Sequence, residues 1–220
     1  MTININKKYF IISVICVIVL VSGFIFLSWM KNNEYEKNVK QCQENIHSLY
    51  YMSSILSAEI HDTWRDYIFD GKKYVDTTTG KFYSSSGSWD LPVNVDGSNL
   101  EYCYDFSEAI SQKVYYFKKK KVNNTLDSLY SATKTLIIEM TPPPTKFEVF
   151  HKEFCDFFHV AEAMYDCATS PEGSLQSYTS TINTLSSDFK KQSSNIDIQI
   201  GEIDEHKKVA LQLNALLRFR

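Results

Sequence analysis

The sequence is short of glycine and proline, and it has no excess of basic residues. Seven Gly and five Pro in 220 residues fit long helices better than a glycine-punctuated α/β enzyme. A formal net charge of -3 gives no reason to expect a nucleic-acid partner, which would favour a basic face. With 44% hydrophobic residues, the chain can form one hydrophobic core of ordinary size, or a helical bundle together with a membrane anchor.

Charged residues are also missing from one long stretch near the N-terminus, YFIISVICVIVLVSGFIFLSWM at residues 9–30. A helix of about 22 residues is roughly 33 Å long, enough to cross a bilayer. The apolar region of a secretory signal is shorter, and here bulky residues occupy the place of a cleavage site. Tyr9 and Trp29 lie at the two ends, where interfacial aromatic residues are found. The sequence therefore predicts an uncleaved transmembrane anchor that contacts the lipid bilayer.

The predicted organisation is a cytoplasmic leader at residues 1–8, the anchor at 9–30 and an extracytoplasmic helical bundle at 31–220. Lys and Arg are nearly balanced on the two sides of the span, so their distribution alone does not orient it. The short leader with Lys7 and Lys8 is typical of a signal-anchor. We therefore expect a single-pass protein of the cell membrane with its C-terminal domain outside.

Helical periodicity continues directly after the anchor. From Tyr35 to Tyr67, apolar residues recur at alternating steps of four and three, which is typical of a helix with a coiled-coil-like seam. No proline or glycine separates this stretch from residues 9–30. The sequence thus predicts one continuous rod that ends near Phe69.

Three interruptions divide the remainder of the chain into further helices. They are KKKK at residues 118–121, TPPPT at 141–145 and ATSPEGS at 168–174. Proline cannot continue the helical hydrogen-bond ladder, so the second interruption ends a helix. In the third, we expect Ser170 to cap the last helix and Pro171 to be its first residue.

The last helix has a seam like that of the first. Its apolar residues run from Leu175 to Leu217 at steps of three and four. We expect these two long helices to pair along much of their length, with Leu49 and Leu56 on one seam and Leu185 and Phe189 on the other. Leu→Ala on either seam would then cost about 2–5 kcal/mol.

Residues 70–99 differ from the rest, because they hold four of the seven glycines and many Thr, Ser and Asp. Within them, KYVDTTTGKFY at 73–83 has β-type residues on both sides of a Thr-Gly turn and could form a short hairpin. The whole stretch could equally be a mobile loop. The predicted fold class is all-α. A transmembrane helix continues into an elongated antiparallel helical bundle, with an irregular or short β-hairpin insertion at about 70–99.

Four segments carry a resemblance to a known group. TWRDYIF (63–69), DFSEAI (105–110), PPPTKFEVFH (142–151) and SPEGSLQSY (170–178) resemble a loosely defined family of uncharacterised small bacterial membrane-anchored proteins and lipoproteins. The resemblance covers roughly residues 55 to 195, and SPEGSLQSY is its most specific piece. The chain departs from the lipoprotein members by its transmembrane anchor. The resemblance implies a bacterial envelope protein and supplies no catalytic residue.

The segment HKEFCDFFHVAEAMYDC at 151–167 contains residue types that bind metals. His151 and Cys155 share a helix face and could supply two zinc ligands, whereas His159 lies roughly 12 Å along the axis from His151. Cys167 is farther still. A zinc site needs about four ligands around one point, and no CxxC or HxxxH motif elsewhere completes the set. We therefore favour a packed border of an apolar helix face, and we nominate no metal ligand.

Four cysteines lie outside the predicted span: Cys42, Cys103, Cys155 and Cys167. In an oxidising compartment they could form disulfides. Cys155 and Cys167 would be about 18 Å apart on one unbroken helix, so they cannot bond to each other. A bridge would have to join elements, for example Cys42 or Cys103 with the helix that carries the other two. Buried free cysteines that act as small hydrophobic residues are the alternative.

Other charged or polar motifs have ordinary explanations. EIHDTWRDY at 59–67 groups Glu59, His61, Asp62 and Asp66 in a way that suggests acid–base chemistry, but a charged outer helix face explains it. The KKKK run could touch acidic lipid or polymer, but a solvated helix end is the more frequent meaning of such a run. NNT at 123–125 fits a glycosylation acceptor, which would be idle in a bacterium. We nominate no catalytic or cofactor-binding residue and expect no cofactor.

These patterns together predict a non-enzymatic, membrane-anchored envelope protein that acts through protein–protein contacts of its bundle, with a partner protein or with itself. One alternative is a sensor or small-ligand-binding bundle, because helical bundles hold ligands between helices. A cell-envelope enzyme is the disfavoured alternative, because the sequence shows no set of nucleophile, base and orienting residue.

Overall fold

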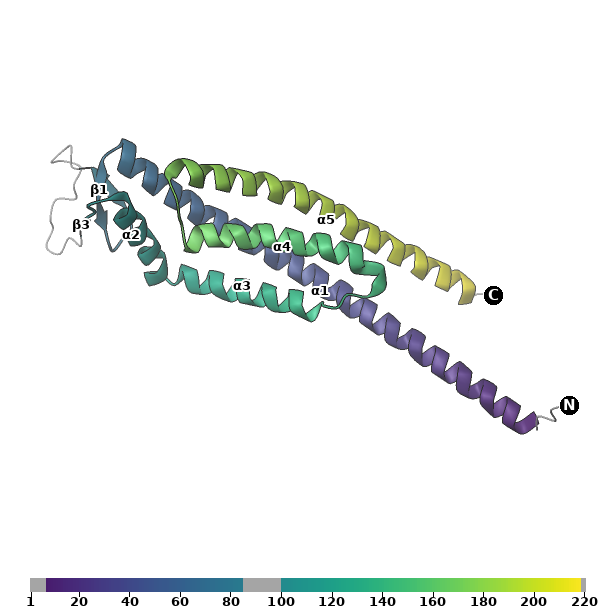
Figure 1. Ribbon diagram of the computed structural model, residues 1–220. Coiled ribbons are helices and arrows are strands. Elements are labelled where there is room, and N and C mark those ends of the chain that lie inside the picture. The colour runs from purple at the N-terminus through teal and green to yellow at the C-terminus, as the bar shows by residue number, and fades with distance from the viewer. Residues whose placement is uncertain (1–6, 85–99, 219–220) are drawn as a thin grey trace.

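The computed structural model describes residues 7–84 and 100–218, with side chains described for residues 15–84 and 100–201. Within these ranges, five α-helices and a small three-stranded antiparallel sheet form an elongated molecule (Figure 1). The sheet lies at one end, and the N-terminal part of the first helix extends beyond the bundle at the other. The predicted all-α fold with a short β insertion is confirmed.

The first helix, α1 (Lys7–Phe69), is 63 residues long and passes through the predicted anchor and into the bundle without a break. Its predicted end near Phe69 is confirmed. The apolar side chains of residues 15–30 pack against no other part of the described structure. By length and composition, this part of α1 is suited to cross a membrane.

Helices α3 (Val122–Glu139), α4 (Glu148–Thr169) and α5 (Leu175–Arg218) lie alongside the second half of α1. In Figure 1, α4 runs in the same direction as α1, whereas α3 and α5 run in the opposite direction. The main contact in the bundle is between α1 and α4, and α5 packs chiefly on α4. The neighbours α3 and α4 are therefore antiparallel, as are α4 and α5, while the best-packed pair, α1 and α4, is parallel.

The core explains why α4 is the preferred partner of α1. One broad face of α4 is apolar and largely aromatic, and it buries Phe150, Phe154, Phe157 and Phe158. The seam of α5 is narrower, and Leu185 on it is only partly buried. The expectation that α1 and α5 pair along much of their length is therefore correct only in part. They touch along a line of contacts such as the stacked rings of Tyr50 and Phe189, whose centroids are 3.6 Å apart.

The lysine run separates two helices as predicted. Helix α2 (Phe106–Lys119) ends inside it, and α3 begins just after it. Lys121 has a φ of 60°, a left-handed conformation that ends one helix and reorients the chain for the next. The prolines end α3 at Glu139, and a 3₁₀ turn at Thr145–Phe147 leads into α4.

Of the two alternatives for residues 73–83, the structure shows the hairpin. Strand β1 (Lys72–Asp76) pairs antiparallel with β2 (Phe82–Ser84). A third strand that the sequence analysis missed, β3 (Leu100–Tyr102), pairs with the other edge of β1, giving the order β2-β1-β3. The part of the predicted insertion at 85–99 lies outside the described residues.

Candidate functional site

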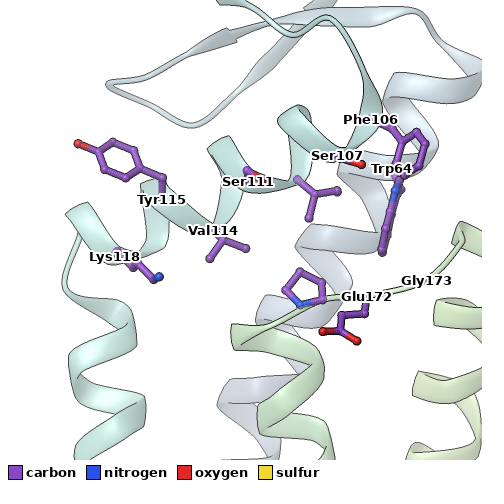
Figure 2. A pocket seen from close by; sticks show the side chains of 11 residues that line it. Trp64, Phe106, Ser107, Ser111, Val114, Tyr115, Lys118, Glu172 and Gly173 are labelled. Atoms are coloured by element: carbon purple, nitrogen blue, oxygen red, sulfur yellow. The ribbon is translucent and has the colours of Figure 1, made fainter.

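A pocket of about 510 Å³ (Figure 2) is lined by elements at the sheet end of the molecule. Figure 1 shows that this end is far from the N-terminal part of α1. The pocket is bounded by the end of α1, by one face of α2 and by the corner between α4 and α5. The residues that line it are Trp64 from α1; Phe106, Ser107, Ile110, Ser111, Val114, Tyr115 and Lys118 from α2; and Pro171, Glu172 and Gly173 from the corner.

Three of the four segments singled out in the sequence meet at this pocket. Trp64 belongs to TWRDYIF, Phe106 and Ile110 to DFSEAI, and Pro171 to SPEGSLQSY. These segments are far apart in the chain, so no spacing in the sequence shows that they converge. The fourth segment, PPPTKFEVFH, lies at the opposite end of the bundle, at the start of α4.

The start of α2 is held by a reciprocal cap. The Asp105 carboxylate accepts a hydrogen bond from the Glu108 backbone N–H (2.8 Å), and the Glu108 carboxylate accepts one from the Tyr104 N–H (2.7 Å). Such caps satisfy the free amides of a first helical turn. This cap fixes the first turn of α2, so that Phe106 and Ser107 face the pocket while Ala109 is fully buried.

The corner between α4 and α5 is built around Gly173. Its φ is +92°, and a Cβ at this position would lie only 2.7 Å from the Ser177 Oγ. Ser174 and Ser177 cap α5 reciprocally, because each backbone N–H donates to the other's hydroxyl at 2.9 and 3.2 Å. The expectation that Ser170 caps α5 and that Pro171 begins it is wrong. Ser170 instead follows the last turn of α4, because the glycine turn and the serine pair delay the start of α5 to Leu175.

Tyr178 joins this corner to α1. Its hydroxyl lies 3.0 Å from the Cys167 carbonyl of α4, to which it donates, and 3.4 Å from the Ser57 carbonyl of α1. Its ring packs edge-on against Trp64, with centroids 4.9 Å apart. Burial raises the pKa of Tyr178 well above its ordinary value, so the hydroxyl stays protonated as a donor. The most specific motif in the sequence therefore has a structural role as well as a place beside the pocket.

The pocket combines apolar surface with hydrogen-bond donors. Ser107, Ser111 and Lys118 are exposed along the pocket face of α2 and present two hydroxyl groups and one ammonium group. The indole N–H of Trp64 is buried and has no hydrogen-bond partner among the described residues, and it belongs to the wall of the pocket. Figure 2 shows Lys118 at one end of the α2 face, Trp64 at the other, and Glu172 on the opposite wall. Such an arrangement can bind a ligand that carries both hydrogen-bond acceptors and an apolar group.

The acidic cluster of the first helix lies on the other side of α2. Glu59 forms an ion pair with Lys113 at 2.8 Å, and Lys113 is itself buried. Asp62 pairs with Arg65 at 3.1 Å, and Asp66 pairs with Lys72 of β1 at 3.0 Å. Each of these three carboxylates has a basic partner, and two of the pairs attach α1 to α2 and to the sheet. The geometry supports a structural role for this cluster.

His151 lies at the far end of the bundle, in a chain of hydrogen bonds. The Thr141 hydroxyl donates to the Ile137 carbonyl (3.1 Å), so its oxygen accepts from His151 Nε2–H (3.2 Å). Nδ1 is therefore unprotonated and accepts from the Tyr35 hydroxyl (3.0 Å). Both ring nitrogens are thus engaged, and the bond from Thr141 to Ile137 favours the tautomer with the proton on Nε2. Burial lowers the pKa of His151, which favours the neutral ring.

The other residues of the metal-type segment are spread apart. His159 is exposed and lies 3.0 Å from the Glu162 carboxylate, and the Cys155 sulfur lies 3.6 Å from His151 Nε2. Cys167 is three turns farther along α4, near Tyr178. Across the residues whose side chains are described, no three His, Cys, Asp or Glu side chains gather as metal ligands.

The structure also places Asn123 of the NNT motif and the four cysteines that lie outside the predicted span. Asn123, in the NNT motif, is buried in the first turn of α3. Cys42 and Cys103 are buried, Cys155 and Cys167 are partly buried, and each has a free thiol in the structure.

Comparison of the chain with models of known protein families, with curated proteins and with solved structures finds no match. The family resemblance therefore stays a prediction.

Proposed function

We propose that this chain is a non-enzymatic, membrane-anchored protein of the bacterial envelope that binds a partner protein at the end of its bundle farthest from the membrane. The observation that carries the proposal is the pocket at that end, with its exposed hydrogen-bond donors on α2 and its apolar walls. The chain segments that form it are held by the cap at Asp105, by the Gly173 corner and by Tyr178. A preformed site of this kind costs little ordering free energy on binding.

The length of α1 supports the same proposal. The helix continues from residue 30 to Trp64 without a break, which corresponds to about 50 Å at 1.5 Å per residue. With residues 9–30 in the bilayer, the pocket is held well beyond the lipid headgroups. The lysine leader favours the outer side of the membrane for this end. A pocket in that position is accessible to proteins of the envelope and remote from the lipid.

The lining favours a particular kind of protein segment. Backbone carbonyls of an extended segment would accept from Ser107 and Ser111, and an acidic side chain would be attracted to Lys118. An apolar side chain would pack between Phe106 and Pro171. Aromatic and apolar anchors beside a few directed hydrogen bonds are the usual source of affinity at such sites.

Site-specific photocrosslinking in intact cells tests the proposal. A photoreactive phenylalanine analogue at Ser111, in the pocket, should give a discrete protein adduct. The same analogue at Ser187, exposed on α5, should not. Lys118→Glu should weaken the Ser111 adduct several-fold, whereas Lys152→Glu on the exposed face of α4 should leave it unchanged. Equal adducts at both positions, or an adduct insensitive to Lys118→Glu, would contradict the proposal.

The size of the pocket supports a second candidate, a site for a small molecule. Its volume of about 510 Å³ lies in the range of ligand pockets, about 300–1,000 Å³. Native mass spectrometry of the protein purified in mild detergent separates the two candidates. A bound compound of low mass that is lost in Ser111→Trp would favour a ligand-binding module. Ser187→Trp serves as the matched control.

A further inference from the structure

Cys42 of α1 and Cys155 of α4 lie at nearly the same height on the two parallel helices. The ring of Tyr35 stacks on that of Phe147, with centroids 4.8 Å apart, and this contact sets the register. Cys42 follows Tyr35 by two turns, and Cys155 follows Phe147 by just over two turns. A second contact, between His47 and Phe157 at 5.5 Å, places the cysteines within one turn of each other as well.

Both sulfur atoms also lie on the side of the α1–α4 pair that α3 covers. The Cys42 sulfur is 3.9 Å from the Thr133 carbonyl of α3. The Cys155 sulfur is 3.6 Å from His151 Nε2, which itself contacts Thr141, two residues beyond the end of α3. Burial, with a smaller electrostatic contribution from Cys155, raises the pKa of Cys42 to about 12. The two thiols thus lie within one helical turn of each other along the helix axes and on the same side of the helix pair.

We propose that Cys42 and Cys155 form a disulfide that joins α1 to α4 when the protein meets a disulfide-bearing oxidant. Cys155 is the more exposed of the two, so its thiolate attacks the oxidant's disulfide first, although burial and the nearby Asp156 raise the pKa of this thiol. The thiolate of Cys42 then attacks the mixed disulfide at the Cys155 sulfur and releases the oxidant as a thiol. In total, two protein thiols lose two protons and two electrons, and the oxidant's disulfide becomes two thiols.

The bond would tie the helix that carries the anchor to its main packing partner. It would close a large loop that includes the sheet, α2 and α3, and a cross-link of this kind stabilises chiefly by restricting the unfolded chain. Its chemistry does not depend on the proposed partner protein. Its formation in the cell does rest on the proposed sidedness, because stable disulfides form in oxidising compartments.

The test uses the full-length protein in detergent, first reduced and then treated with oxidised glutathione. Peptide mapping should show one linkage, Cys42 to Cys155, with Cys16, Cys103 and Cys167 still open to alkylation. The thermal midpoint should rise by roughly 10 °C over the reduced protein. Cys155→Ser should abolish both changes, and Cys167→Ser should leave both intact.

Several outcomes would overturn the inference. They are five free thiols after oxidation, a lasting glutathione adduct on Cys155 with Cys42 free, or a linkage between another pair. Because Cys42→Ser alters a fully buried position and could prevent folding, the half-buried Cys155 carries the variant test. Acid-quenched thiol trapping in intact cells is a separate readout. A bond that forms in the purified protein but not in cells supports the pairing and contradicts the outward orientation.

Discussion

The hydroxyl of Tyr35 donates to Nδ1 of His151 across 3.0 Å, and this hydrogen bond joins α1 to α4 over 116 positions of sequence. Together with the bond from Nε2–H to Thr141, it uses both nitrogens of the imidazole. A histidine that looks like a metal ligand in the sequence is therefore part of the packing between helices. Its titration is consequently linked to folding.

Replacement of His151 should reduce stability and change its pH dependence. In His151→Phe the Tyr35 hydroxyl loses its acceptor, which should cost about 1–3 kcal/mol at pH 7.5. Burial lowers the pKa of His151 in the folded state, so the unfolded chain binds a proton more readily. The wild type should therefore lose stability as pH falls below the unfolded value of about 6.5 towards the lower folded pKa.

Urea unfolding at pH 7.5 and at pH 5.5 measures this effect. His151→Phe should show a smaller loss between the two pH values than the wild type. His159→Gln is the comparison for an exposed histidine, and it should change the pH dependence less than His151→Phe does. An unchanged pH dependence in His151→Phe would show that its titration is not linked to folding.

Gly173→Ala should destabilise the protein by about 1–3 kcal/mol. The left-handed φ and the close approach to Ser177 leave no room for a Cβ without movement of the corner. Gly201 on α5 is the matched control, because a Cβ there meets nothing within 4 Å. Gly201→Ala should be neutral or stabilising by up to about 1 kcal/mol, since alanine is the better helix former. Thermal unfolding of the two variants side by side distinguishes them.

Truncation of Leu49 should cost about 2–5 kcal/mol, because its side chain is fully buried between helices. Leu185 is only partly buried on α5, so Leu185→Ala should cost less. Ser48→Ala and Ser187→Ala, at exposed neighbouring positions, should stay within about half a kcal/mol. The measurement is chemical unfolding of the full chain in detergent. If Leu49→Ala unfolds like the parent, the α1 seam is not part of a stabilising core.

The apolar part of α1 should hold the protein in membranes at its uncut mass. After cell lysis, the full-length chain should sediment with membranes and resist extraction by alkaline carbonate. Val19→Arg, in the middle of the span, should weaken insertion, because a central arginine costs about 2.5–3.5 kcal/mol on insertion scales. Val149→Arg, at an exposed position of α4, is the control. Recovery of a shorter soluble form of the parent would contradict the anchor.

Local patterns in the sequence were enough to predict most helix boundaries. The end of α1 near Phe69, the break at the lysine run and the stop at the prolines all depend on neighbouring residues. The hairpin follows from β-type residues on both sides of a short turn. These features are local, because backbone preferences and side-chain periodicity act within a few residues.

Contacts between helices and strands that are far apart in the sequence could not be predicted in the same way. A seam shows that a helix has an apolar face, but not whether α4 or α5 covers it. Strand β3 is only three residues long, too short for a clear alternating pattern. The pocket also depends on such long-range contacts, since Trp64, Phe106 and Pro171 meet only after the helices have packed. Their segments stand out in the sequence, but nothing in the sequence shows that they meet.

The continuity of α1 has a mechanical consequence. With residues 9–30 inserted as proposed, no hinge separates the transmembrane span from the part of the same helix that reaches the pocket. Transmembrane helices tilt to match the thickness of the bilayer. A change of about 10° in tilt would swing a rigid arm of roughly 50 Å sideways by about 9 Å at its tip. Lipid composition would thereby set the position of the pocket relative to the membrane surface.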